Sequence, residues 1–148
     1  MAITYTNIIQ DNVIDSLHTL LSDEFPVPIK YDEHTGNQSF FIVPADDSLV
    51  EIINEGQSRE YNVTISYQLK TGGNYTINNF KQVSNIAERV KRLILNNSAY
   101  SPSSTYKFHN GNISSIEYER DEDDATILRS LITFNCIVLE VVWKSKQN

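Results

Sequence analysis

Residues 59–69 read REYNVTISYQL, and this stretch decides the fold. From Tyr61 onward, apolar and polar residues alternate without interruption. Successive side chains of a strand point to opposite faces, so the pattern predicts one strand with an apolar face and an uncharged polar face. The apolar set is Tyr61, Val63, Ile65, Tyr67 and Leu69; the polar set is Asn62, Thr64, Ser66 and Gln68. The apolar face must pack in a core. The polar face suits either a partly solvated surface or a contact with a partner protein.

A second long strand is predicted near the C-terminus, where residues 126–143 contain almost no strand-breaking residue. One face carries Ile132, Phe134, Cys136, Val138 and Val142; the other carries Leu131, Ile137, Leu139, Val141 and Trp143, interrupted by Thr133 and Asn135. Both faces are largely apolar, so both must be covered. Helices can cover one. We expect another copy of the protein to cover part of the other, the alternative being that residues 44–58 and 98–112 fold back over it.

Two amphipathic helices are predicted from apolar residues that recur at helical spacing. The first spans about residues 6–22, with Thr6 or Asn7 as N-cap, and ends at Phe25-Pro26-Val27-Pro28 because proline cannot continue a helix. The second spans residues 80–95, where Glu88 and Arg92 have the spacing of a favourable i,i+4 ion pair. Its apolar stripe consists of Phe80, Val83, Ala87, Val90 and Ile94.

Shorter strands are predicted between and after the helices. They are residues 29–31, residues 40–43 (stopped by Pro44-Ala45-Asp46-Asp47), residues 49–53 (with a helical turn as the alternative), residues 106–109 and residues 113–120. Residues 54–58 are predicted as a loop, and Asn110-Gly111 predicts a hairpin turn between the strands of residues 106–109 and 113–120. The order predicts an α+β fold: a mostly antiparallel sheet with two helices packed on one face, in a single domain over residues 1–148.

Composition narrows the function classes. The 148 residues are 40% hydrophobic and carry a formal net charge of −7, which argues against broad contact with a nucleic-acid backbone. The single cysteine, Cys136, excludes a disulfide within one chain and is expected to be a buried, inert thiol. No apolar run approaches the length of a membrane span, and the N-terminus has no secretory pattern, so we expect synthesis in the cytosol.

No motif indicates an enzyme. The five glycines form neither a phosphate loop nor a dinucleotide fingerprint, and His18, His34 and His109 lack metal-ligand spacing. The run Asp121-Glu122-Asp123-Asp124 lacks the alternation and glycine of a calcium loop. We therefore predict no catalytic, cofactor or metal site. A metal-dependent enzyme that uses Asp46, Asp47 and the acidic run is retained as an alternative.

The charged residues suggest a contact between subunits. Lys81, Arg89, Lys91 and Arg92 give the second helix a modest basic patch, with no interleaved aromatic residues of the kind that bind nucleic acid. An acidic neighbour is the expected contact, and the acidic run of an adjacent subunit could supply it. Such a pairing joins two different surfaces and is of the type that generates rings.

The layout of the whole chain resembles the tail terminator, or tail completion (neck), proteins of long-tailed bacteriophages. The resemblance rests on the opening helix with Asn7-Ile8-Ile9-Gln10-Asp11-Asn12-Val13-Ile14, the exit Pro26-Val27-Pro28, the strand of residues 59–69, the helix of residues 80–95 and the closing strand pair with its acidic turn. It implies a small α+β domain that forms a ring of about six copies on the last ring of the tail tube and docks onto the head connector. The family has no active site to carry over.

The resemblance sets further expectations. The protein would be a virion component assembled in the host cytoplasm, with tail tube protein and head connector protein as partners, while DNA passes through the ring without specific binding. The candidate interface residues are Asn62, Thr64, Ser66, Gln68, Arg89, Arg92, Asp121, Glu122, Asp123 and Asp124. The alternative function is a small acidic binding or inhibitor module, such as a nucleic-acid mimic, an antitoxin or an immunity protein. The placement of Glu117, Glu119 and residues 121–124 should separate the two.

Overall fold

The computed structural model describes residues 3–71, 77–103 and 106–141. In chain order, its elements are a π-helix η1 (Ile9–Ile14) that continues into α1 (Asp15–Glu24), β1 (Ile29–Lys30), β2 (Gln38–Ile53), β3 (Gly56–Lys70), α2 (Ile77–Asn96), β4 (His109–Arg120) and β5 (Ile127–Val141). The strands form one sheet in the order β1-β2-β3-β5-β4, in which β1 pairs in parallel with β2 and the other pairs are antiparallel. The predicted α+β fold is confirmed.

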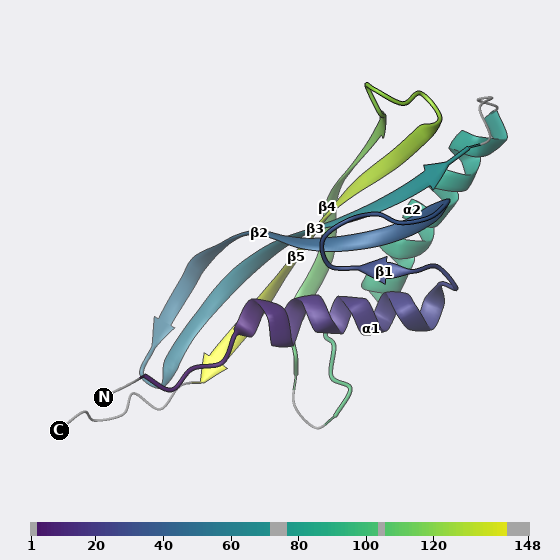
Figure 1. Cartoon of the computed structure of the whole chain (residues 1–148). Helices are drawn as coiled ribbons and strands as arrows, with labels where there is room; N and C mark the ends of the chain where they lie inside the picture. The colour runs from purple at the N-terminus through teal and green to yellow at the C-terminus, as the bar shows by residue number, and fades with distance from the viewer. Residues whose placement is uncertain (1–2, 72–76, 104–105, 142–148) are drawn as a thin grey trace.

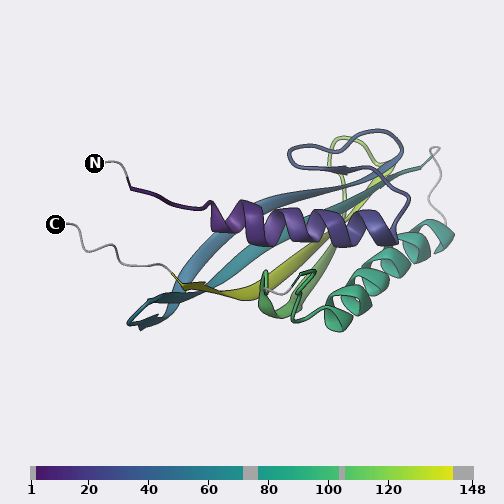
Figure 2. The same cartoon turned by 90° about the horizontal axis from the view of Figure 1, so that it is seen from below.

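Both helices lie on the same face of the sheet, as predicted (Figures 1 and 2). The central strand β3 pairs along its length with β2 on one side and with β5 on the other, so Ile65 lies between Ile42 and Ile132. All five apolar residues of the 61–69 alternation are buried beneath the helices. Burying a large apolar side chain contributes about 1.5–3 kcal/mol, so burial of this row contributes strongly to the stability of the sheet.

The two faces of β5 were assigned correctly. Ile132, Phe134, Cys136 and Val138 are all buried in the core, whereas Val142 and Trp143 lie outside the described residues. Burial raises the pKa of the Cys136 thiol to about 12, so the thiol stays protonated and unreactive at neutral pH. The expected inert cysteine is confirmed.

The first helix begins and ends close to the predicted positions. The side chain of Asn7 accepts a hydrogen bond from the backbone N–H of Gln10 at 3.3 Å, which is the bond expected of an N-cap residue. The first turns are wound as a π-helix before the chain settles into α1. Phe25 ends the helix with φ −120° and ψ 131°, the extended conformation that a following proline favours.

The prediction for residues 40–58 was wrong in its boundaries. Pro44 does not stop the strand: β2 runs through it to Ile53, with register shifts after Pro44 and after Leu49, and only Asn54 and Glu55 form the turn into β3. The proline is tolerated because β1 pairs with β2 only at Phe40 and Phe41. Beyond that point the outer edge of β2 has no strand partner among the described residues, so the missing N–H of proline costs no ladder hydrogen bond.

The predicted Asn110-Gly111 hairpin turn was also wrong. Both residues lie inside β4, at a register shift against β5, and Asn110 has the left-handed φ of 54° that asparagine tolerates. Gly111 donates its N–H to the carbonyl of Ser98 at 2.8 Å and lies directly against the ring of Phe108. The dipeptide therefore bends one strand against a loop and does not connect two strands.

The second helix matches its prediction, with Val83, Ala87, Val90 and Ile94 buried. Phe80 departs from the predicted stripe because it is 45% exposed and carries the Arg120 guanidinium 5.7 Å from its ring centroid. Glu88 pairs with Lys91 at 2.8 Å instead of with Arg92. Both spacings bring side chains together on a helix. Within the described ranges, neither helix is long and apolar enough to cross a bilayer.

Candidate functional site

The sheet has a second face that carries no helix, here called the helix-free face. At one end of it the chain covers itself: residues 31–37, between β1 and β2, place His34 against Ser39 and Ser66 (Figures 1 and 2). Ser66 is 0% exposed beneath this loop. Gln68 is 9% exposed, and its side chain accepts a hydrogen bond from Arg129 Nε at 3.0 Å. Two of the four polar residues that the alternation offered as a contact surface are therefore engaged within the chain.

His34 holds this loop down through both ring nitrogens. Its Nδ1 lies 2.8 Å from Ser39 Oγ, its Nε2 lies 2.8 Å from Ser66 Oγ, and its ring meets the Phe41 ring edge-on at 4.5 Å. A neutral imidazole has one donor and one acceptor nitrogen, so it satisfies both hydroxyls. Since both serines are fully buried, neither hydroxyl can reach a substrate, and the cluster is a structural latch.

The latch predicts a stability change at mildly acidic pH. Burial, assisted by the charge of Arg129, lowers the pKa of His34 to about 4 from its ordinary 6.5. Between these values the unfolded chain binds a proton that the folded chain does not, so stability falls as the pH drops from 6.5 towards 4. We expect a loss of about 1 kcal/mol, discounted because solvent reaches part of the ring.

Urea unfolding at pH 7 and at pH 5 measures this effect. The His34→Gln variant should be less stable at pH 7 and should lose most of the difference between the two pH values. His18→Gln is the control, because His18 lies at the helix surface next to Ser22 and Tyr31. An unchanged pH difference in His34→Gln would contradict the assignment.

The middle of the helix-free face carries an uncharged polar strip. Asn62, Asn135 and Asn112 lie side by side across β3, β5 and β4, and Asn135 donates a hydrogen bond to the Asn112 side chain at 3.4 Å. The next row consists of Thr64, Thr133 and Ser115. Asn62 and Thr64 thus remain at the surface, and strand pairing adds four residues that the sequence analysis did not select. The sequence did contain an indication of this strip, because Thr133 and Asn135 interrupt a strand that is otherwise apolar.

Around this strip the helix-free face carries both charged and apolar side chains and is only partly covered: by strand register, Glu60, Glu117 and Arg129 lie on the same face as the apolar residues of β5. Leu131 and Ile137 are half-buried, whereas Leu139 and Val141 are 50% and 59% exposed. The alternative in which residues 44–58 and 98–112 fold over this face is wrong. Residues 44–58 extend the sheet itself. Residues 98–112 contribute Phe108 to the core and are tied to the helix side, where Asn12 Nδ2 donates to the carbonyl of Lys107 at 3.0 Å.

Residues 44–58 form a projecting hairpin, here called the arm (Figure 1). Three apolar residues of the arm, Leu49, Val50 and Ile52, are between 46 and 68% exposed. Polar contacts stiffen its base: Arg59 pairs with Asp47 at 2.5 Å, and Gln57 donates to Glu140 at 2.5 Å. The arm is therefore a stiff element that presents apolar side chains to the outside.

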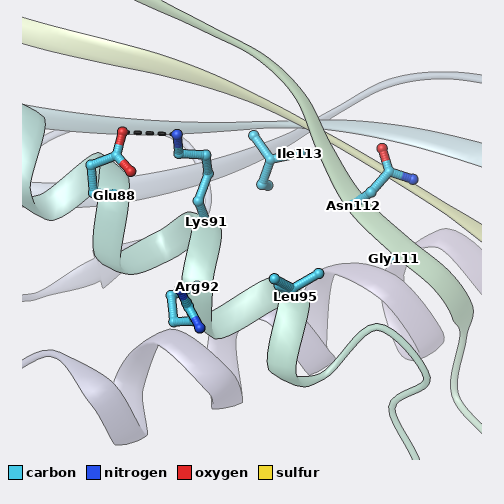
Figure 3. A pocket seen from close by; sticks show the side chains of 7 residues that line it. All are labelled: Glu88, Lys91, Arg92, Leu95, Gly111, Asn112 and Ile113. Carbon is cyan, nitrogen blue, oxygen red and sulfur yellow. Dashed lines mark ion pairs between the residues drawn. The ribbon is translucent and has the colours of Figure 1, made fainter.

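The basic patch on α2 borders a groove between α2 and β4. The groove has a volume of about 340 Å³; Lys91, Arg92 and Leu95 line it from the helix, and Ile113 lines it from the strand (Figure 3). A shallower hollow along the same helix is lined by Lys81, Arg89 and Arg92. Arg89 and Arg92 are the two cations of this helix that the sequence analysis selected as interface residues. Arg89 is engaged within the chain: it pairs with Glu24 at 2.8 Å, and its guanidinium carbon lies 4.4 Å from the centroid of the Phe25 ring.

The acidic turn is partly folded inward. Asp121 accepts the backbone N–H groups of Asp123 and Asp124 and pairs with Arg129 at 2.8 Å, and the pKa of Asp121 is lowered first by the Asp124 bond and then by Arg129. Asp124 accepts the hydroxyl and N–H of Thr126, which lower its pKa. This leaves Glu122 and Asp123 exposed. Glu117 and Glu119 are exposed on β4, and Glu119 lies 3.5 Å from Arg129.

The candidate residues thus fall into separate surfaces. The acidic turn and the arm lie at opposite ends of the sheet, because β4 and β5 meet at the turn next to the Leu69 end of β3, whereas the arm is formed at its Gly56 end. Asp46 contacts Asn62 and Asp47 contacts Arg59, far from residues 121–124. Among residues 3–71, 77–103 and 106–141, no three His, Cys, Asp or Glu side chains are grouped to hold a metal ion.

Comparison with protein-family models and with curated proteins finds no match to this chain.

Proposed function

We propose that this chain is a structural virion protein that closes into a ring, caps a phage tail tube and joins it to the head connector. The observation that carries the proposal is the set of exposed apolar side chains on the arm and on the adjoining end of β5: Leu49, Val50, Ile52, Leu139 and Val141. By strand register, Leu49 and Ile52 lie on the face of the sheet opposite to Leu139 and Val141, so apolar side chains are exposed on both faces at this end of the molecule. Exposed apolar groups gathered in this way mark a place where another protein binds. The rest of the proposal follows the resemblance of the chain's layout to tail terminator proteins.

The uncharged strip supports a role next to DNA. Asn62, Thr64, Thr133 and Asn135 offer hydrogen-bonding groups without positive charge, and the chain as a whole carries a net charge of −7. A ring whose lumen is lined by such residues lets the phosphate backbone slide, because tight phosphate binding depends on lysine and arginine. In this arrangement the helix-free face lines the channel, and the apolar arm contacts neighbouring subunits.

The acidic turn favours the ring over a nucleic-acid mimic. A mimic needs its carboxylates spread over one outer face, where a positively charged partner can reach them. Here Asp121 and Asp124 are directed at the chain's own backbone N–H groups, and Arg129 neutralises part of the charge beside Glu119. Of the carboxylates at this end of the sheet, Glu117, Glu119, Glu122 and Asp123 remain exposed, whereas Asp121 and Asp124 are bound within the chain.

The proposal predicts concentration-dependent self-association. Light scattering behind a sizing column should find monomers at low concentration and, at higher concentration, one assembly of about six copies, since a heterologous contact that closes gives a ring of fixed size. Negative-stain images of that fraction should show rings with a central hole. A strict dimer at every concentration would count against the proposal. A neighbouring gene for a tail tube or head connector protein would support the virion assignment independently.

A further inference from the structure

The arm and the groove beside α2 have opposite charge. Residues 44–58 contain the carboxylates Asp46, Asp47, Glu51 and Glu55 and no lysine or arginine, a formal charge of −4. Helix α2 contains Lys81, Arg89, Lys91 and Arg92 against the single carboxylate of Glu88, a formal charge of +3. Four of the chain's twelve cationic residues therefore lie on this one helix. In an acidic protein, this concentration of positive charge gives an acidic element a preferred place to bind.

Both surfaces also carry apolar groups. Leu49 and Ile52 share one face of the arm, since they pair with Arg59 and Gln57 of β3, whose side chains point to that face. On the other side, Leu95 is 67% exposed, and it faces Ile113 across the groove (Figure 3). An apolar centre with a charged border is the usual composition of a specific protein contact.

The groove is open to an extended segment. Strand β4 pairs with β5 on one side, and its other edge is a sheet edge within the described part of the chain. An exposed edge can accept an added strand from another chain. The arm is a two-stranded hairpin whose base is stiffened by the Arg59–Asp47 and Gln57–Glu140 contacts, so little flexibility is lost when it binds.

We infer that the arm of one copy docks into the α2–β4 groove of the next copy, with Leu49 and Ile52 against Leu95 and Ile113. Glu55, in the turn at the tip of the arm, then lies near Lys91 and Arg92, while Glu51 on the opposite face of the arm adds to its negative charge; the structure records no ion pair for either carboxylate. The arm and the groove are different surfaces, at the Gly56 end of β3 and beside α2, so the contact is heterologous and repeats from copy to copy. The inference rests on the proposed ring and identifies the surfaces that close it.

Charge reversal on each surface tests this contact. The arm-reversed variant carries Glu51→Lys and Glu55→Lys, and the groove-reversed variant carries Lys91→Glu and Arg92→Glu. All four side chains are exposed, so both variants should fold, which circular dichroism verifies. Each variant alone brings like charges together and should need a concentration at least about tenfold higher for half-assembly. Lys30→Glu, an exposed change on β1, is the control and should assemble like the natural chain.

Mixing the two variants in equal amounts is the decisive step. The lysines introduced on the arm of one variant then meet the glutamates introduced in the groove of the other, and the natural arm carboxylates of the second variant meet the natural groove cations of the first. Assembly should return to nearly the natural concentration, as alternating rings with an even number of subunits. A third variant that carries all four substitutions should also assemble by itself. Added salt should weaken the natural assembly and narrow the differences between variants, because screening reduces both attraction and repulsion.

The outcomes separate this inference from the proposed function. Natural protein that assembles while neither reversal changes its assembly would overturn the arm-in-groove contact and leave the ring intact. Loss of assembly in both variants without recovery on mixing would overturn the contact as well, since the two surfaces would then act with other partners. Natural protein that stays monomeric at every concentration would contradict both the ring and the contact.

Discussion

Replacing Phe134 with alanine is expected to lower the free energy of unfolding by about 3–5 kcal/mol, the range observed when a buried phenylalanine is truncated. Phe134 is fully buried at the centre of β5, opposite Val63 on β3 and Ile113 on β4. Its ring also meets the Phe108 ring edge-on at 5.3 Å. The truncation therefore leaves a cavity where the sheet meets the loop that follows α2. Because a domain of this kind is stable by only about 5–15 kcal/mol, the variant should have a much lower midpoint in urea.

The matched control is the next residue. Thr133 lies on the opposite face of the same strand, half-exposed within the uncharged strip, so Thr133→Ala should change stability by no more than about 0.5 kcal/mol. Because the two residues are neighbours on the same strand, the comparison tests whether the face on which a side chain lies decides the cost of removing it. Similar losses from the two substitutions would show that the assigned faces of β5 are wrong.

Gly111→Ala is expected to cost about 1–3 kcal/mol through overpacking. A Cβ atom at this position would lie 2.8 Å from the Phe108 Cε1 atom and 3.2 Å from the carbonyl oxygen of Ser98. Phe108 is 1% exposed and is held between the Tyr100 and Phe134 rings, so it has little room to move. The unfolding midpoint in urea measures the loss.

A double-mutant cycle attributes this cost to its source. In a Phe108→Leu background, Gly111→Ala should cost less, because the smaller side chain makes room for the added methyl group. Gly36→Ala serves as a comparison: Gly36 has a φ of 67° with nothing near its missing Cβ, so its substitution strains the backbone without a clash. The cost at Gly36 should be independent of Phe108. If the cost at Gly111 were equally independent, the close approach would not be its cause.

Long alternations made much of the fold predictable. The 61–69 stretch and β5 each repeat their pattern over many residues, and a strand with the opposite face assignment would place a whole row of apolar side chains in water. The same reasoning applies to α2, where four buried residues recur at helical spacing. These elements could be assigned to the core from the sequence because each carries its own signal.

The errors arose where distant pairing overrides a local signal. Pro44 normally stops a strand, but it is tolerated at an edge, and whether β2 is an edge depends on how few residues β1 contributes. Asn110-Gly111 is a strong turn signal, yet the antiparallel pairing of this part of the chain comes before it, where Tyr100 and Phe108 form an isolated bridge. No property of either short stretch reveals these neighbours.

The candidate site was also only partly predictable from the sequence, because its outcome depends on residues that are distant along the chain. Asn62 and Thr64 remain on the surface, but the burial of Ser66 depends on His34, more than thirty residues away in the sequence, and Gln68 is bound by Arg129 of a distant strand. Histidine next to a turn gives no indication of the strand it will cover. The groove beside α2 was equally hidden, since β4 and the helix form its walls only after the sheet has assembled.

The run of β2 past Pro44 also has a consequence for aggregation of the free protein. A long edge strand with exposed apolar residues is the kind of segment from which fibrils grow, because identical chains can stack along it. Pro44 and the two register shifts of β2 interrupt the regular edge to which another chain would have to pair. The carboxylates of the arm also repel those of a second copy. Free copies of the protein should therefore resist fibril-like stacking along this edge even at high concentration.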